Sequence, residues 1–272
     1  MRANTRALLS DPRFSVRDFG PKGKWGMLSF SSPREALECA KQHARTENEE
    51  LWHSSPKWQG LGTQSLKSLD VSGIAEHPLA AIRAANAALP HKQSRPGIIQ
   101  PSIAGGAWSI PAVLAGLPLA ARSRARTKLA PLTINLVCAW SASVSDEKLS
   151  PVFAKLGRAL NDYTLAGGSV SLFLHYIGFL RAGPIDSIRG AIIRMRVPTA
   201  DLAQLSLGCS VAAFRAVSGP LIAALSNSRC DTIIVPQAID NPIPASIYLG
   251  GRTSTGDIGP SLASTLEALA IH

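Results

Sequence analysis

The chain has 272 residues, of which 46% are hydrophobic, and a formal net charge of +10. This length and composition exclude a disordered chain, and they allow one large domain or one domain with a sizeable appendage. The charge is uneven, because residues 1–130 hold 18 of the 28 Lys and Arg but only 9 of the 18 Asp and Glu. A basic first half favours polyanionic partners, above all nucleic acid, although charge also serves solubility.

The first region, residues 1–97, is expected to be basic and mainly helical. Its clearest signal is "SSPRE", in which Ser32 can cap a helix, Pro33 suits the first helical position and Glu35 stands three after the cap. This pattern predicts a helix through about residue 45. Tryptophans lie among the basic residues of the first half, where they would form stacking platforms for single-stranded nucleic acid or, more commonly, pack in the core.

The second region, residues 98–130, is expected to be a Gly- and Pro-rich connector that ends in a basic segment. Its uncharged part, residues 98–121, is long enough to cross a membrane as a helix. Prolines and glycines interrupt it every turn or two, so we expect a packed connector and no membrane association. The amino terminus lacks a secretory pattern and the cysteines form no C-x-x-C pair, which predicts a cytoplasmic protein with reduced thiols.

The third region, residues 131–272, is expected to be an α/β domain with a Rossmann-like sheet. An apolar run at 132–139, an amphipathic stretch at 146–166 and a second run at 169–178 predict strand, helix and strand. That order is typical of a βαβ unit in a parallel sheet. Apolar residues spaced three and four apart predict the buried face of the helix: Leu149, Phe153, Leu156, Leu160 and Tyr163.

Further elements are predicted toward the carboxyl terminus. We expect a strand at 187–197, a helix that is capped by Thr199 and broken near residues 218–220, and a strand at 231–236. The segment 248–259 contains several glycines but lacks the spacing of a phosphate-binding loop. We interpret it as a flexible turn before a last helix, and no nucleotide cofactor is predicted.

The cluster "SASVSDE" follows the first predicted strand of the third region. Ser141 and Ser143 stand where open α/β sheets bind ligands, at the carboxyl end of a strand, and His175 is expected at the end of the next strand. The order of strand, serines and helix resembles the von Willebrand factor A domain, whose metal motif is Asp-x-Ser-x-Ser. Ala139 occupies the position of the aspartate, and a hard divalent cation needs that carboxylate. The resemblance therefore implies a degenerate magnesium-type site, and we predict no bound metal.

Two other interpretations of the serines compete. Ser141 or Ser143 would act as a nucleophile if His175 were its base and Asp240 oriented the ring, but the G-x-S-x-G turn is missing. The alternative is a helix cap, because Asp146 follows Ser143 by three residues. The cap explains the acidic residues as well as the serines, so we predict no catalytic residue.

The whole layout is similar to a group of uncharacterised bacteriophage proteins. The shared pattern is an amino-terminal W-x-G region, a Gly-rich connector of the form "aGG.W.vp..laG.P" and a von Willebrand A-like sheet domain. The resemblance implies a phage or mobile-element setting, in the host cytoplasm or in a virion, and no activity. The matching positions are Trp58, Gly60, Gly105, Gly106, Trp108, Pro111, Leu114, Gly116 and Pro118.

Basic residues with a period of two form the best candidate surface. Arg122, Arg124, Arg126 and Lys128 would share one face of an extended segment, where they could contact successive phosphates. Arg194 and Arg196 share a face of a predicted strand in the same way, although charge at a sheet edge also serves to prevent strand pairing.

The predicted function is therefore a non-catalytic interaction protein that binds nucleic acid or a nucleic-acid-containing assembly. Two alternatives remain open. One is a structural or virion component that acts by protein assembly, and the other is a serine hydrolase.

Overall fold

A central six-stranded mixed sheet, with the order β1-β2-β8-β7-β6-β9, organises the protein. The computed structural model describes residues 3–43, 80, 99–102, 107–108, 121–124, 131–140, 146–165, 168–180, 188–198, 202–225, 240–244 and 246–251. The sheet consists of β1 (Phe14–Asp18), β2 (Lys24–Phe30), β6 (Leu132–Trp140), β7 (Val170–Phe179), β8 (Ile188–Val197) and β9 (Ser246–Gly251). Some neighbouring strands of this sheet are parallel and others are antiparallel, so the sheet is mixed.

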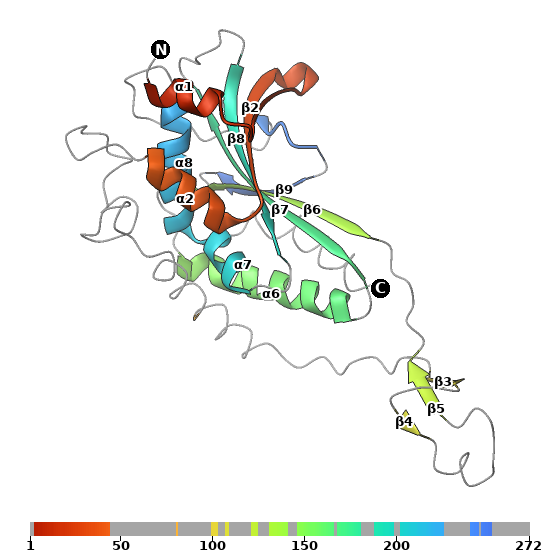
Figure 1. The fold of residues 1–272 in the computed structure, drawn as a ribbon. Helices are drawn as coiled ribbons and strands as arrows, with labels where there is room; N and C mark the ends of the chain where they lie inside the picture. Colours follow the sequence, from red (N-terminus) through yellow and green to blue (C-terminus); the bar gives the residue numbers. More distant parts are fainter. Residues whose placement is uncertain are drawn as a thin grey trace.

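The α-helices whose packing is described cover one face of this sheet (Figure 1). Their apolar side chains form the larger core cluster together with the strand residues of that face. In the part of the chain that the structure describes, no helix is both long and apolar enough to span a membrane. These helices are α1 (Ala3–Leu9), α2 (Pro33–His43), α6 (Asp146–Leu165), α7 (Leu202–Cys209) and α8 (Val211–Leu225).

The predicted βαβ unit is confirmed. Strand β6 runs parallel to β7, with Leu132 opposite Val170 and Cys138 opposite Tyr176, and α6 connects them. Every residue of the predicted apolar stripe on α6, from Leu149 to Tyr163, is at most 5% exposed. Burial of that stripe against the sheet is what makes the 3.6-residue period a dependable signal.

Strand β8 is antiparallel to β7, whereas the sequence predicted a parallel sheet. Leu172 lies opposite Val197 and Phe179 lies opposite Gly190. A parallel return needs about a dozen residues or more for its crossover, and residues 180–187 are too few. The two strands therefore pair in opposite directions, as the short connection requires.

The predicted helix break near residues 218–220 is wrong. The chain breaks at Ser210, between α7 and α8, and Pro220 lies buried inside α8. Ser210 caps α8, because its Oγ accepts a hydrogen bond from the backbone N–H of Ala213 at 3.2 Å. At the far end of α8, Thr5 Oγ1 of α1 donates to the carbonyl of Ala224 at 2.7 Å. Packing therefore tolerates a proline that local propensity alone would place at a helix end.

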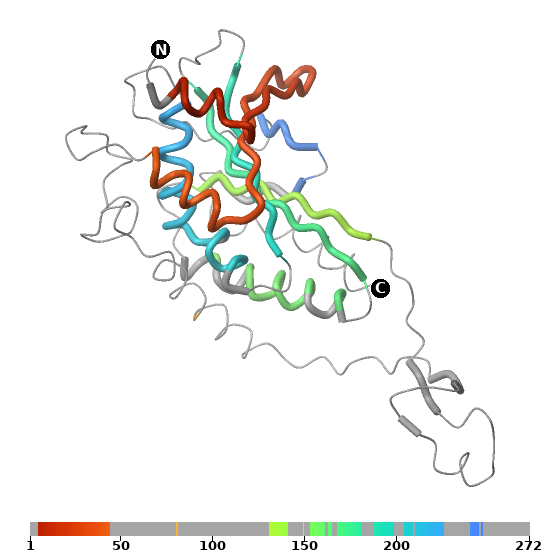
Figure 2. Tube along the Cα trace, viewed as in Figure 1, coloured from red at the N-terminus to blue at the C-terminus, as the bar shows by residue number. Residues whose placement is uncertain are grey.

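Residues near the amino terminus belong to the same sheet as the third region. Strand β2 pairs in parallel with β8, from Lys24 opposite Ile188 to Phe30 opposite Met195, and β1 pairs antiparallel with β2. Figure 2 shows α2, in orange, beside α8 in blue. The sequence predicted neither strand, so the helical description of residues 1–97 misses this part of the sheet.

The predicted helix cap at Ser32 is confirmed. Ser32 Oγ accepts a hydrogen bond from the backbone N–H of Glu35 at 3.2 Å, and α2 begins at Pro33. The Glu35 carboxylate turns back and accepts hydrogen bonds from the backbone N–H and the hydroxyl of Ser31. These reciprocal bonds satisfy donors that a helix start leaves without partners.

A three-stranded antiparallel sheet lies within the predicted connector. It has the order β3-β5-β4 and consists of β3 (Ile99–Ser102), β4 (Ala107–Trp108) and β5 (Ala121–Arg124). Elsewhere, the predicted turn at 248–259 begins inside β9, which pairs in parallel with β6. The predicted strand at 231–236 and the cap at Thr199 lie outside the described residues.

Candidate functional site

The candidate site is the face of the sheet on which none of the described α-helices packs, and in that sense we call it the helix-free face. Side chains alternate along a strand, so residues of β8 at even positions from Ile188 to Arg196 belong to this face. One part is apolar and forms a second core cluster. That cluster consists of Trp25, Met27, Val137, Ala139, Ile177, Ile192 and Ile243. The adjacent part is polar and basic, and its side chains are the ones that could bind a ligand.

Arg194 lies at the centre of the polar part. It stands opposite His175 of β7 and Ser29 of β2, and its side chain is half-buried. Its guanidinium carbon lies 4.0 Å from the centroid of the Phe173 ring, which is a cation–π contact. Burial and the positive charge of Arg17 both lower the pKa of Arg194. The guanidinium nevertheless remains charged at neutral pH, because arginine is effectively always protonated in proteins.

His175 is buried beside this arginine. Its Nε2 lies 3.1 Å from Oδ1 of Asn135 on the neighbouring strand β6. Burial lowers the pKa of His175 to about 3, and the charge of Arg194 adds to that effect. The ring is therefore neutral at physiological pH, and we assign the proton to Nε2 because a carbonyl oxygen accepts it. Among the described residues, Nδ1 has no hydrogen-bond partner.

His175 is placed differently from the strand-end position that the sequence predicted. It lies in the middle of β7, level with Val137, and β6 continues to Trp140 before it ends. Asp240, the predicted third member of a triad, forms an ion pair with Arg189 at 3.1 Å. Asn135, and not a carboxylate, therefore orients His175. Ser141 and Ser143 lie outside the described residues.

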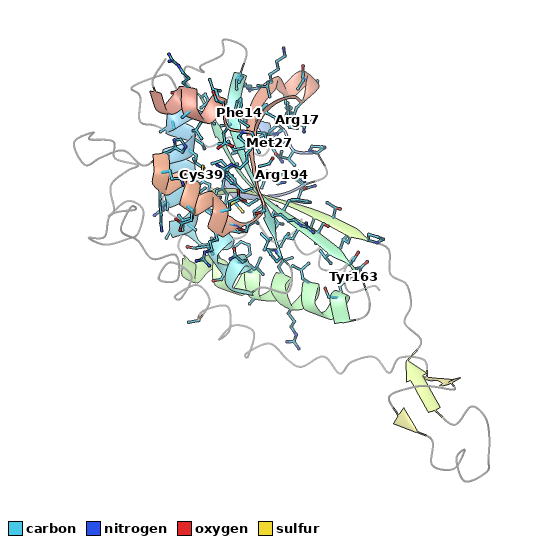
Figure 3. All side chains as sticks on the ribbon, viewed as in Figure 1. Phe14, Arg17, Met27, Cys39, Tyr163 and Arg194 are labelled. Atoms are coloured by element: carbon cyan, nitrogen blue, oxygen red, sulfur yellow. The ribbon has the colours of Figure 1, made fainter. Side chains whose placement is uncertain are left out.

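Arg17 and Arg196 extend the positive charge around Arg194. Both are exposed, Arg17 on β1 and Arg196 on β8, where Arg196 stands opposite Phe173. Figure 3 labels Arg17 and Arg194 on either side of Met27, which comes from the strand between them. Within the described part of the chain, no carboxylate pairs with any of these three arginines. As far as the described residues go, the positive charge of this polar part is therefore not offset by a carboxylate.

The basic row of the connector is described only at its start. Arg122 and Arg124 belong to β5, where the backbone is extended as the sequence predicted. Arg126 and Lys128 lie outside the described residues. The row therefore stays a prediction, while the placement of Arg194 and Arg196 on one face follows from their strand.

Sequence reasoning missed three contributors to the face, namely Arg17, Phe173 and Asn135. A signal for Arg17 was present, because "FSVRD" and "KWGMLSF" flank the turn-rich stretch "FGPKG" as two strands of a hairpin would. The contributions of Phe173 and Asn135 depend on strand register, which periodicity does not determine. Comparison of the chain with protein-family models, with curated proteins and with solved structures gives no match.

Proposed function

We propose that the protein binds nucleic acid, without catalysis, through basic side chains on the helix-free face. The observation that carries this proposal is the gathering of Arg17, Arg194 and Arg196 on one face without a described carboxylate partner. Such a cluster repels itself, so it favours an anionic partner. Phosphates are suitable partners because a guanidinium presents a rigid fork of donors to their oxygens.

The proposal includes a phage or mobile-element setting, in the host cytoplasm or in a virion. It also includes a von Willebrand A-like version of the Rossmann-like sheet without a complete metal motif. The support for this setting is the W-x-G and Gly-rich connector pattern, together with the βαβ unit formed by β6, α6 and β7. The basic row of Arg122, Arg124, Arg126 and Lys128 would lengthen the contact with the phosphate backbone.

The proposal leaves hydrolysis out for a chemical reason. A general base must reach the proton that it removes and must have a pKa near the working pH. His175 is buried, its Nε2 faces Asn135, and its pKa lies at about 3. A group in that state contributes little as a base.

The test is fluorescence anisotropy of the full chain with labelled oligonucleotides, titrated through salt. The variant R17A/R196A removes two exposed charges from the helix-free face, and we expect the slope of log K against log salt to become shallower by about 1.4 for a single strand. R6A/R34A is the matched control, because Arg6 and Arg34 are exposed on α1 and α2. It should leave the slope unchanged.

A further variant, R122A/R124A/R126A/K128A, measures the contribution of the connector row. Absence of binding at low salt would overturn the proposal. Equal weakening by R17A/R196A and by R6A/R34A would also overturn it, since binding would then follow net charge and not this face.

A further inference from the structure

We propose that the ligand of the helix-free face is single-stranded nucleic acid, one base of which stacks on the guanidinium of Arg194. This inference rests on the proposed function and assigns it a substrate class. It follows from the way in which Phe173, Arg194 and their neighbours are placed on β6, β7 and β8.

The first step is the position of the Arg194 side chain. Arg194 stands opposite His175 in the register of β7 and β8, yet its guanidinium lies over the ring of Phe173, two residues along. It therefore leans along the sheet instead of extending into solvent. A guanidinium is planar, so stacking at 4.0 Å from the ring centroid uses one of its faces, and the inference assigns the other face to a second planar group.

The second step is the surroundings of that stacked pair. In the register of the sheet, Phe173 stands between Arg196 of β8 and Asn135 of β6. The Asn135 carbonyl is engaged by His175, which leaves its amide N–H groups as donors on this face. A base on Arg194 would thus have hydrogen-bond donors on one side, and its phosphate would have the exposed Arg196 on the other.

The third step separates a single strand from a duplex. A base inside a duplex is already stacked on both faces, and a guanidinium that stays on the Phe173 ring does not enter a groove to reach it. On the helix-free face, a duplex would contact the exposed Arg17 and Arg196 through its phosphates. A single strand offers unstacked bases, and stacking on aromatic or guanidinium planes is how proteins hold them.

The experiment compares the single strand and the duplex of one sequence on the full chain, with R194K as the principal variant. Lysine keeps the charge of Arg194 but has no planar face. We expect R194K to weaken single-strand binding by about tenfold and to leave duplex binding nearly unchanged. R34K on α2 is the matched control and should change neither.

A second readout does not depend on any variant. The fluorescence of 2-aminopurine depends on what the base stacks on, so saturation of an oligonucleotide that carries it with wild-type protein should change the signal, and R194K should lessen that change. DNA and RNA versions of the probe separate the two kinds of strand. Absence of any fluorescence change with wild-type protein would overturn the inference, even if R194K failed to fold.

The outcomes distinguish this inference from the proposed function. Binding of both nucleic acids with equal loss in R194K would overturn stacking and leave a phosphate-binding face. Duplex binding that is tighter than single-strand binding would have the same meaning. No binding of either nucleic acid would overturn the proposed function itself.

Discussion

The two faces of the central sheet differ in how well their buried polar groups are hydrogen-bonded. On the helix-covered face, Tyr176 donates to the carbonyl of Gly208 at 2.5 Å and Ser218 donates to that of Phe214 at 2.5 Å. On the helix-free face, a buried His175 lacks a described partner for Nδ1, and half-buried Arg194 has an aromatic ring beneath it. A buried polar group without a partner costs stability, and proteins often keep such groups for binding. The difference therefore makes the helix-free face the better candidate for a binding site.

The contrast has one exception. The indole Nε1 of Trp140 is buried on the helix-covered face, and the described residues provide no partner for it. Its ring packs edge-on against Phe153 and Phe214, at centroid distances of 6.2 and 6.4 Å. The aromatic packing therefore holds the indole in the core.

The largest expected effect is the loss of stability when Phe214 is removed from the core on the helix-covered face. Its ring is 2% exposed and lies 4.9 Å from that of Tyr176. We expect F214A to lower the free energy of unfolding by about 3–5 kcal/mol, because the cavity cannot be filled from a rigid core. Urea unfolding followed by circular dichroism measures this. V16A, on exposed β1, is the control and should cost under about 0.5 kcal/mol.

His175, in the polar part of the helix-free face, should make the stability of the protein depend on pH. The pKa of His175 is about 3 in the folded protein and near 6.5 in the unfolded chain, so the unfolded chain binds the proton more readily. Stability is therefore full above pH 6.5 and is lost as the pH falls toward 3. At pH 5 we expect a loss of about 2 kcal/mol from this group.

The variant H175Q tests that assignment. Glutamine does not titrate, so its unfolding free energy should be flatter than that of the wild type between pH 6.5 and 4.5. Parallel pH profiles for the two proteins would show that His175 is protonated in the folded state, or that other groups dominate. Chemical denaturation at each pH is the measurement.

Gly190 sharpens the comparison at the apolar part of the helix-free face. A Cβ at this position would contact the ring of Trp25, which is fully buried, and the backbone carbonyl of Gly178. We expect G190A to cost about 1–3 kcal/mol by overpacking. Trp25→Phe should recover part of the loss in the double variant, as a thermodynamic cycle would measure. Additive effects would mean that the two residues do not meet.

The smallest expected effect comes from Arg13, which directly precedes β1 and links Asp11 to Glu35 of α2. It pairs with Asp11 at 2.6 Å and with Glu35 at 3.0 Å. The hydrogen bond from Arg13 is the main reason that the pKa of Asp11 is lowered. R13M should cost about 1 kcal/mol at pH 7. Because a carboxylate with a lowered pKa stabilises above its unfolded pKa, the difference between wild type and R13M should shrink as pH falls below about 4.

Local signals predicted several elements well, and each for an identifiable reason. The α6 stripe repeats every three or four residues, so one sequence window contains the whole pattern. The cap of α2 needs only residues 31 to 35. The predicted break near residues 218–220 was wrong because helix propensity alone marks Pro220 as a helix stop. Packing of α8 in the core, where Pro220 is buried, outweighs that preference.

The candidate site could be predicted only in part. Arg194 and Arg196 were found because alternation along one strand assigns them to one face. The contacts of Arg194 with Phe173 and of His175 with Asn135 were not, because they depend on which strands pair and in which register. The predicted ligand role of Ser141 and Ser143 remains a prediction.

The sequence by itself determined the βαβ unit, the buried face of α6 and the start of α2, because periodicity and capping act over a few residues. Only the tertiary structure decided that β2 pairs with β8, that β8 opposes β7, and that His175 meets Asn135 across 40 residues of chain. Those choices depend on how burial is shared between distant segments, and no local pattern contains that information.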